Sequence, residues 1–271
     1  MSCGILLSSI PDDMKIIQNL LLRYFEYLFR DTSTLTYKTP QWMMGHNPQA
    51  VLLDYGCGQG LFTMEMAKQL GTLQAVGIEL NDLMASQAQS NGVKTLRADL
   101  NHPLPFKNNS VHVITAFNVL EHLVETEMFI QEIYRLLIPG GYVIIDTPNL
   151  ASWHNIAALL VGLQPFSGPN ISSMTESDIP IVRRMHRRAH GIPEEGEYYR
   201  TSEPERHRHL VVVAYRSLVK AIKRTGLSID TAIGYGYYPF PPPLSRLLSR
   251  IDPYHSHHMV IKASKPSGII E

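Results

Sequence analysis

Between residues 49 and 149, short apolar runs alternate with stretches that place apolar residues at helical spacing. The runs are AVLLDYG, QAVGIEL, KTLRADL, VHVITAF and GYVIIDTP, and the stretches between them include LFTMEMAKQLG and ETEMFIQEIYRLLIPGG. Strands that alternate with helices favour right-handed β-α-β crossovers and a parallel sheet covered by helices on both faces. Because the runs are largely apolar at both odd and even positions, we expect these strands to be buried on both sides.

The flanking segments add a helix before this region and an interrupted continuation after it. Residues 12–31 begin with two Asp residues and then place apolar side chains at helical spacing, which predicts a helix, and a polar stretch follows at 32–48. After residue 149 the alternation stops until about residue 208. It then resumes with an extended segment at 209–214, a helix at 215–225, a strand at 227–233, a Pro-rich loop at 239–243, a helix at 244–250 and a strand at 258–263.

The simplest organisation is one sheet domain with two additions. We expect an N-terminal helical extension at 1–48, a sheet domain built from 49–150 and 209–266, and an insertion at 151–208 that begins with a helix at 151–163. The insertion follows the carboxyl end of a predicted strand, which is where open α/β sheets bind ligands. It is therefore expected to form a lid and to contribute to ligand binding.

Composition narrows the class of protein. Hydrophobic residues make up 44% of the 271 residues, and 24 basic residues balance 24 acidic ones. This argues against a disordered chain and against a surface that is basic throughout. The two cysteines, Cys3 and Cys57, do not have the spacing of a disulfide framework or a zinc site. Residues 1–10 lack the pattern of a signal peptide, and the apolar stretch at 156–163 is too short to span a membrane, so we expect a cytoplasmic protein.

The most informative motif is VLLDYGCGQG at 51–60, an apolar strand followed by glycine at every second position. Glycine lets a turn adopt positive φ and lets a ligand approach the backbone closely. A dinucleotide fingerprint requires a further glycine at position 61, where this chain has Leu61. With the acidic Asp54 before the turn, a ligand that carries an ammonium group fits better than a pyrophosphate. An ordinary tight strand–helix turn is the alternative.

Four further segments lie at the ends or starts of predicted strands. They are Glu79 after VGI, Asp99 in LRADL, FNVLEH at 117–122 and LIPGG at 137–141. With the glycine motif, these segments occur in the order typical of one family over residues 49–149. The chain resembles the class I S-adenosylmethionine-dependent methyltransferases, in particular the small-molecule type that has an L-E-H segment after the fourth strand.

The resemblance implies a Rossmann-like, doubly wound α/β fold, with a mostly parallel seven-stranded sheet whose last strand is antiparallel. It implies S-adenosylmethionine as cofactor and S-adenosylhomocysteine as product. In this family the residue that matches Glu79 holds the ribose hydroxyls, and the one that matches Asp99 accepts from the adenine amino group. The cofactor-binding residues implied are Asp54, Gly56, Gly58, Gly60, Glu79, Leu80, Asp99, Leu100 and Asn118.

Each of these residues also has a purely structural interpretation. Asp54 could close the turn, and Glu79 could cap the next helix, although Asn81 is the better cap candidate. Asp99 could be a solvated residue at a strand end. The segment at 118–122 could be a hydrogen-bonded turn.

The acceptor of the methyl group is harder to predict. Methyl transfer to oxygen needs a base, and His209 and His122 are the candidate catalytic residues. His209 lies in RHL, which resembles the G-H-x-R-x-F segment of related methyltransferases, although Arg208 and Val211 depart from that pattern. Either histidine could instead brace neighbouring loops.

Four residues are candidates for lining an acceptor pocket. The segment TPNLASW at 147–153 resembles T-P-N-L-x-S-W of a methyltransferase sub-group, which points to Asn149, Trp153 and the adjacent His154. Tyr237 belongs to an aromatic cluster before the Pro-rich loop. A Pro-Asn turn followed by an amphipathic helix, and packing of the aromatic cluster against the sheet edge, are the structural alternatives.

The sequence favours a small-molecule acceptor. The N/D-P-P-Y/F motif of amino-methylating nucleic-acid enzymes is absent, and the Arg- and His-rich residues at 183–209 are offset by glutamates at 194–205. A nucleic-acid or protein acceptor that uses this basic insertion stays open as an alternative, as does a cofactor-binding module without catalysis. No metal-ligand set is predicted, and the oligomeric state is not predicted either.

Overall fold

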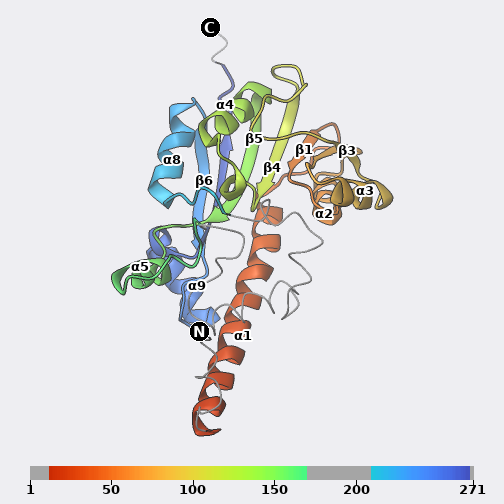
Figure 1. The fold of residues 1–271 in the computed structure, drawn as a ribbon. Coiled ribbons are helices and arrows are strands. Elements are labelled where there is room, and N and C mark those ends of the chain that lie inside the picture. Colours follow the sequence, from red (N-terminus) through yellow and green to blue (C-terminus); the bar gives the residue numbers. More distant parts are fainter. Residues whose placement is uncertain (1–11, 170–208, 269–271) are drawn as a thin grey trace, which may run out of the picture.

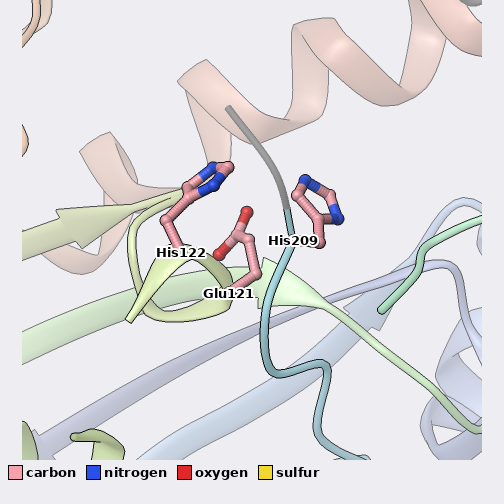
Figure 2. Close-up of side chains that lie close together, drawn as sticks. All are labelled: Glu121, His122 and His209. Carbon is pink, nitrogen blue, oxygen red and sulfur yellow. The ribbon is translucent and has the colours of Figure 1, made fainter. Parts of the chain in front are cut away.

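The computed structural model describes residues 12–169 and 209–268, and a seven-stranded sheet runs through it (Figure 1). The strands are β1 (Val51–Tyr55), β2 (Gln74–Ile78), β3 (Lys94–Leu96), β4 (Val111–Phe117), β5 (Leu137–Pro148), β6 (Ser228–Tyr235) and β7 (His258–Ser264). The α-helices are α1 (Asp12–Met43), α2 (Leu61–Leu70), α3 (Asp82–Ser90), α4 (Thr126–Leu136), α5 (Trp153–Leu160), α8 (Tyr215–Arg224) and α9 (Pro242–Ile251). Two short 3-10 turns are η1 (Leu120–His122) and η3 (Pro253–His255), and Figure 2 draws the side chains of Glu121 and His122 from η1.

The predicted fold class is confirmed. The strand order is β3-β2-β1-β4-β5-β7-β6, and β1 to β5 pair in parallel. Strand β7 lies between β5 and β6 and is antiparallel to both. Because β2, β1 and β4 are parallel neighbours, their carboxyl ends lie along one edge of the sheet, which is the usual ligand edge of this architecture.

Adjacent residues of the central strands enter two different cores. Leu52, Val113 and Ile144 pack with residues of α1 and α2 on one face of the sheet. Leu53 and Ile114, one position further along, pack with residues of α4 and α8 on the opposite face. Successive side chains of a strand point to opposite faces of the sheet, and helices cover both faces. The strands are therefore apolar at both odd and even positions.

Helix α1 continues to Met43, beyond the predicted end at residue 31, and passes through Pro40. The threonines that make this stretch look polar are buried, and Thr32 and Thr36 donate hydrogen bonds to helix carbonyls four residues earlier. Thr36 also bonds the Tyr235 hydroxyl at the end of β6, at 2.9 Å. Tertiary contact with the sheet therefore overrides the weak local helix propensity.

The N-terminal half of α1 projects past the carboxyl ends of the strands and runs beside α9 (Figure 1). Arg246 of α9 forms an ion pair with Asp31 of α1, and the Tyr24 hydroxyl donates to the Pro239 carbonyl. The helical extension predicted at 1–48 is thus attached to the C-terminal part of the chain. The predicted domain boundaries themselves remain predictions.

Most of the predicted insertion at 151–208 lies outside the described residues, including the Arg- and His-rich stretch before residue 209. Its described part contains α5 (Trp153–Leu160), which lies within the helix predicted at 151–163. Within the described part of the chain, no helix combines the length and apolar character needed to cross a membrane.

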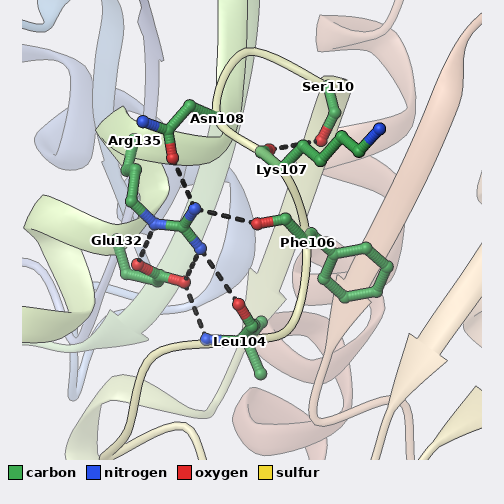
Figure 3. Close-up of polar contacts among 7 residues, drawn as sticks. All are labelled: Leu104, Phe106, Lys107, Asn108, Ser110, Glu132 and Arg135. Atoms are coloured by element: carbon green, nitrogen blue, oxygen red, sulfur yellow. Dashed lines mark hydrogen bonds and ion pairs between the residues drawn. The ribbon is translucent and has the colours of Figure 1, made fainter.

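One ion-pair network anchors the loop that precedes β4 (Figure 3). Arg135 of α4 donates two hydrogen bonds to Glu132, at 2.6 and 2.7 Å, and others to the carbonyls of Leu104 and Phe106 and to Asn108. Glu132 also accepts from the Leu104 N–H at 2.8 Å. Burial alone would raise the pKa of Glu132, but the hydrogen bonds from Arg135 and Leu104 lower it. The pair therefore stays charged and holds loop and helix together.

We expect Arg135→Ala to lower the free energy of unfolding by about 2–3 kcal/mol, because it leaves the buried Glu132 carboxylate and two carbonyls without their donor. Arg97→Ala is the matched control. It removes an ion pair with Asp82 in which both side chains are more than 60% exposed, so the loss should be under about 1 kcal/mol. Urea denaturation of the three proteins measures both values. Equal losses for the two variants would contradict a special role for Arg135.

Candidate cofactor and acceptor site

A cavity of about 470 Å³ opens at the carboxyl ends of β1 and β4. Four predicted cofactor residues line it, namely Asp54, Gly56, Gly58 and Asn118. The other lining residues are Thr36, Cys57, Gln59, Leu61, Phe62, Glu65 and Phe117. Thr36 belongs to α1, so the N-terminal helix forms part of the wall, which local sequence motifs did not indicate.

The glycines of the motif are needed for two different reasons. Gly58 has φ of +53°, and a Cβ atom there would meet no atom within 4 Å, so this position faces open space along the cavity. Gly60 has φ of +79°, and a Cβ atom there would lie 2.8 Å from Val93 Cγ2 and 3.0 Å from Ala88 Cβ. Gly58 thus leaves room for a ligand, whereas Gly60 lets the loop pack against α3 and the following turn.

Asp54 is the buried acid at the base of the cavity. Its side chain is only 2% exposed, and its carboxylate accepts hydrogen bonds from the hydroxyls of Thr63 and Thr115. Burial raises the pKa of Asp54 to about 6, although these two hydrogen bonds oppose the shift. A positively charged ligand group in the cavity would favour the ionised form of this acid.

Glu79 ties the glycine loop to the next strand. It follows β2 directly, is half-buried, and accepts from the backbone N–H groups of Gly58 at 3.0 Å and Asn81 at 2.8 Å. Asn81 caps α3 by accepting from the Met84 N–H at 3.0 Å, so the cap role that could explain Glu79 belongs to Asn81. The carboxylate of Glu79 is held in place beside the loop and is still partly open to solvent.

The remaining predicted cofactor residues lie further along the same edge of the sheet. Asp99 lies three residues past the end of β3, which stops at Leu96, and its carboxylate accepts from the backbone and side-chain N–H groups of Asn101, both at 2.9 Å. Leu100 packs against the larger core, and Leu80 is half-buried. The predicted cofactor residues thus follow four neighbouring strands, in the order β3, β2, β1 and β4.

Comparison with known proteins shows similarity to methyltransferases. A family model described as a methyltransferase domain matches residues 53–145. A protein of Mycolicibacterium smegmatis, described as a probable S-adenosylmethionine-dependent methyltransferase, is 28% identical over 102 residues, which is 36% of this chain and 38% of that protein.

Residues 53–145 thus form a methyltransferase domain of the class I S-adenosylmethionine-dependent type.

Two further relatives of this methyltransferase extend the comparison. A ubiquinone biosynthesis O-methyltransferase of Bradyrhizobium diazoefficiens is 28% identical over 124 residues, which is 42% of this chain and 45% of that protein. The structure of a methyltransferase from Thermotoga maritima superposes with a TM-score of 0.53 at 15% identity, covering 93% of this chain and 98% of that one, which shows a shared fold. The chain spans less than half the length of these two curated relatives.

The candidate catalytic histidines of the methyltransferase lie together with an acid. Glu121, His122 and His209 each place one side-chain donor atom within 4.8 Å of the others, and the two imidazole rings are 5.0 Å apart (Figure 2). Leu210 and Val211, next to His209, donate their N–H groups to the Glu121 carbonyl at 2.6 and 3.2 Å. The structure thus brings together two residues that are far apart in the sequence, and it adds Glu121.

The polar partners of this cluster are defined. Glu121 Oε2 accepts from the Thr147 hydroxyl at 3.0 Å, and His209 Nδ1 lies 2.7 Å from the Ser167 carbonyl oxygen. A carbonyl oxygen only accepts, so Nδ1 carries the proton and Nε2 keeps its lone pair. Burial raises the pKa of Glu121, although the nearby His209 opposes this, and burial lowers the pKa of His209.

A buried network of hydrogen bonds, which we call the buried relay, joins Thr36, Tyr235, Asp146 and His258. The sequence analysis did not predict it. Asp146 of β5 accepts from the Tyr235 hydroxyl and lies 3.0 Å from His258 Nδ1, and Tyr235 in turn bonds Thr36 of α1. The only available sequence signal is the acid at the end of the apolar run YVIID, because its partners come from distant segments.

The four predicted acceptor residues are not among those that line the cavity beside the glycine loop. Asn149 is completely buried, and its amide bonds the carbonyls of Tyr254 and Ser256 and the N–H groups of Ala151 and Tyr215. Its side chain therefore braces the chain around the end of β5.

Trp153, His154 and Tyr237 are likewise engaged within the protein. Trp153 donates to the Tyr237 hydroxyl, which donates to Asp252, and the Trp153 ring stacks on His255. His154 packs against His257 with ring centroids 4.7 Å apart, and burial lowers its pKa to about 3, so it stays uncharged. Their roles in acceptor binding remain predictions.

We expect Gly58→Ala and Gly60→Ala to separate binding from stability. Gly58→Ala should weaken binding of S-adenosylhomocysteine at least about tenfold with a stability loss of only about 1–2 kcal/mol, because its methyl group enters open space at positive φ. Gly60→Ala adds a steric clash to the same backbone strain and should lower stability further. Calorimetric titration and urea denaturation measure the two effects. A Gly58→Ala protein with unchanged affinity would show that the ligand does not approach this backbone.

The affinity for S-adenosylhomocysteine should rise with pH through the titration of Asp54. A ligand ammonium favours the ionised acid, so binding below pH 6 must release a proton. At pH 5, about a tenth of the carboxyl groups is ionised, and the affinity should be about tenfold lower than at pH 7. Titrations at both pH values test this, and in Asp54→Asn the dependence should largely disappear. The same tenfold change in Asp54→Asn would assign it to another group.

Proposed function

We propose that this protein transfers a methyl group from S-adenosylmethionine to a small-molecule acceptor. The observation that carries the proposal is the cavity beside the glycine loop, which has a buried acid at its base and Glu79 fixed at the neighbouring strand end. A volume of about 470 Å³ lies in the range of small-ligand sites. Family membership and the ubiquinone O-methyltransferase among the relatives support methyl transfer to a small molecule.

Each end of the cofactor would meet a different set of residues. Asp54 suits the ammonium of the amino-acid part, and the N-terminus of α2, which follows the glycine loop, suits its carboxylate. Glu79, with its two oxygens held by backbone N–H groups, suits two ribose hydroxyls as a bidentate acceptor. Asp99 and Leu100, after β3, would lie at the adenine, as in the family pattern.

The cluster of Glu121, His122 and His209 prepares the acceptor in this proposal. When bound, S-adenosylmethionine supplies a methyl group that is already activated by the sulfonium. The protein then has to align the acceptor for in-line displacement and manage the proton that leaves the acceptor oxygen. His122 follows Asn118 by four positions in the chain, and Asn118 lines the cavity, so η1 connects the cofactor side of the site to the cluster.

The decisive test is binding and turnover with matched variants. The wild-type protein should bind S-adenosylhomocysteine, and Glu79→Gln should weaken this at least about tenfold, because an amide cannot accept from two hydroxyls with both atoms. Glu127→Gln, an exposed change on α4, is the control and should bind as wild type. Formation of S-adenosylhomocysteine with panels of hydroxylated small molecules, RNA and protein then identifies the acceptor class.

The outcomes are distinct. No binding of S-adenosylhomocysteine by the wild type would overturn the proposal, and unchanged binding by Glu79→Gln would overturn only the ribose assignment. Turnover only with RNA or only with protein would show that this macromolecule, and not a small molecule, is the acceptor. Binding without turnover on any panel would favour a catalytically silent module.

A further inference from the structure

We propose that Glu121, His122 and His209 bind one divalent transition-metal ion of the Zn²⁺ type. Two imidazoles and one carboxylate form a three-ligand set that is known from catalytic zinc sites. The three donors come from η1 and from the segment before α8, and Figure 2 shows their side chains turned toward a common space. No metal motif is visible in the sequence, because His209 lies far along the chain from Glu121 and His122.

The Glu121 carboxylate has an oxygen that calls for a partner. The side chain is 0% exposed, and among the described residues no hydrogen-bond donor reaches Oε1. Thr147 satisfies only Oε2. A buried carboxylate oxygen without a partner is costly, and a bound cation would remove that cost.

The hydrogen bond of His209 has the arrangement expected for a metal ligand. Its Nδ1–H donates to the Ser167 carbonyl at 2.7 Å, which fixes the ring orientation and the tautomer and leaves the Nε2 lone pair for coordination. Metal-bound histidines commonly use their second nitrogen in this way. Thr147 plays the same supporting role for the carboxylate.

The spacing suits an ion after a small adjustment of side chains. Donors bound to a tetrahedral Zn²⁺ at about 2.1 Å lie roughly 3.4 Å apart. In the structure the three donor atoms lie within 4.8 Å of one another. Side-chain rotations that shift these atoms by about 1 Å would bring them to the spacing of bound ligands. The N–H groups of Leu210 and Val211 bind the Glu121 carbonyl, so the backbone segments that carry His209 and Glu121 are already held together.

Three protein ligands leave a fourth position for the acceptor, and this step rests on the proposed function. An acceptor hydroxyl bound there would lose its proton near neutral pH, as metal-bound water does. The hydroxyl proton would pass to solvent water when the oxygen binds the ion. The oxygen–carbon bond would then form while the sulfur–carbon bond breaks, with S-adenosylhomocysteine as the leaving group. The site therefore favours acceptors with an ionisable hydroxyl, such as phenols and enols.

Metal binding can be tested without turnover. The chelator-treated full chain is titrated with Zn²⁺ in equilibrium dialysis, and with Co²⁺, whose visible absorption reports low-coordinate nitrogen and oxygen ligation. We expect one tight ion per chain in the wild type. Glu121→Gln and His209→Ala should each weaken binding at least about tenfold and reduce the Co²⁺ bands. Glu121→Gln keeps the buried shape, so it remains informative if His209→Ala folds poorly.

His255→Ala is the matched control, because His255 also lies beside an acid, Asp252, but outside the cluster. It should bind Zn²⁺ as wild type. Equal Zn²⁺ binding by wild type, Glu121→Gln and His209→Ala would place the ion elsewhere and overturn the inference, as would no tight binding by the wild type. S-adenosylhomocysteine titration of the same proteins keeps this result separate from the proposed function, because cofactor binding does not require the cluster.

Discussion

The arrangement at the carboxyl edge of the sheet depends on how buried acids are satisfied. Asp54, Glu121 and Asp146 are all buried at or just beyond the ends of β1, β4 and β5. A buried carboxylate requires hydrogen bonds or a positive partner. Asp54 accepts from two threonine hydroxyls, and Asp146 contacts Tyr235 and His258. Glu121 accepts from Thr147 through one oxygen, and its other oxygen has no hydrogen-bond partner among the described residues and lies beside two histidines. Asp54 and Asp146 thus hold neighbouring segments together through their hydrogen bonds. Glu121 keeps one oxygen that a cation could bind.

Helix α1 also contributes to this edge of the sheet, although it precedes the predicted cofactor-binding segments in the sequence. Thr36 contributes both to the cavity wall and, through Tyr235, to the relay that ends at Asp146. Displacing the helix would therefore open the cavity and disturb a buried acid at the same time. This coupling gives the N-terminal extension a direct influence on the site, although it carries none of the predicted cofactor residues.

Local sequence predicted the structure best where the functional residues lie in short segments. The strand order and the positions of Asp54, Glu79 and Asn118 follow from local runs and from a family pattern that repeats in order along the chain. Prediction was weakest where contacts join distant segments. The end of α1 was placed twelve residues too early because Thr32 and Thr36 look polar, and only packing on β6 explains their burial. Asp146 with His258, and Glu121 with His209, have no spacing that a motif could record.

The antiparallel insertion of β7 has a consequence for when the site comes into existence. This strand slots between β5 and β6 and delivers His258 to Asp146, while the carbonyls of Tyr254 and Ser256 just before it hold Asn149. A growing chain that has completed the glycine loop and β1 to β5 already contains every predicted cofactor residue. It still lacks β7 and β6, the two strands that complete the sheet beyond β5. The buried relay can therefore be completed only after residues 228–264 have been synthesised, whereas every predicted cofactor residue lies before residue 119.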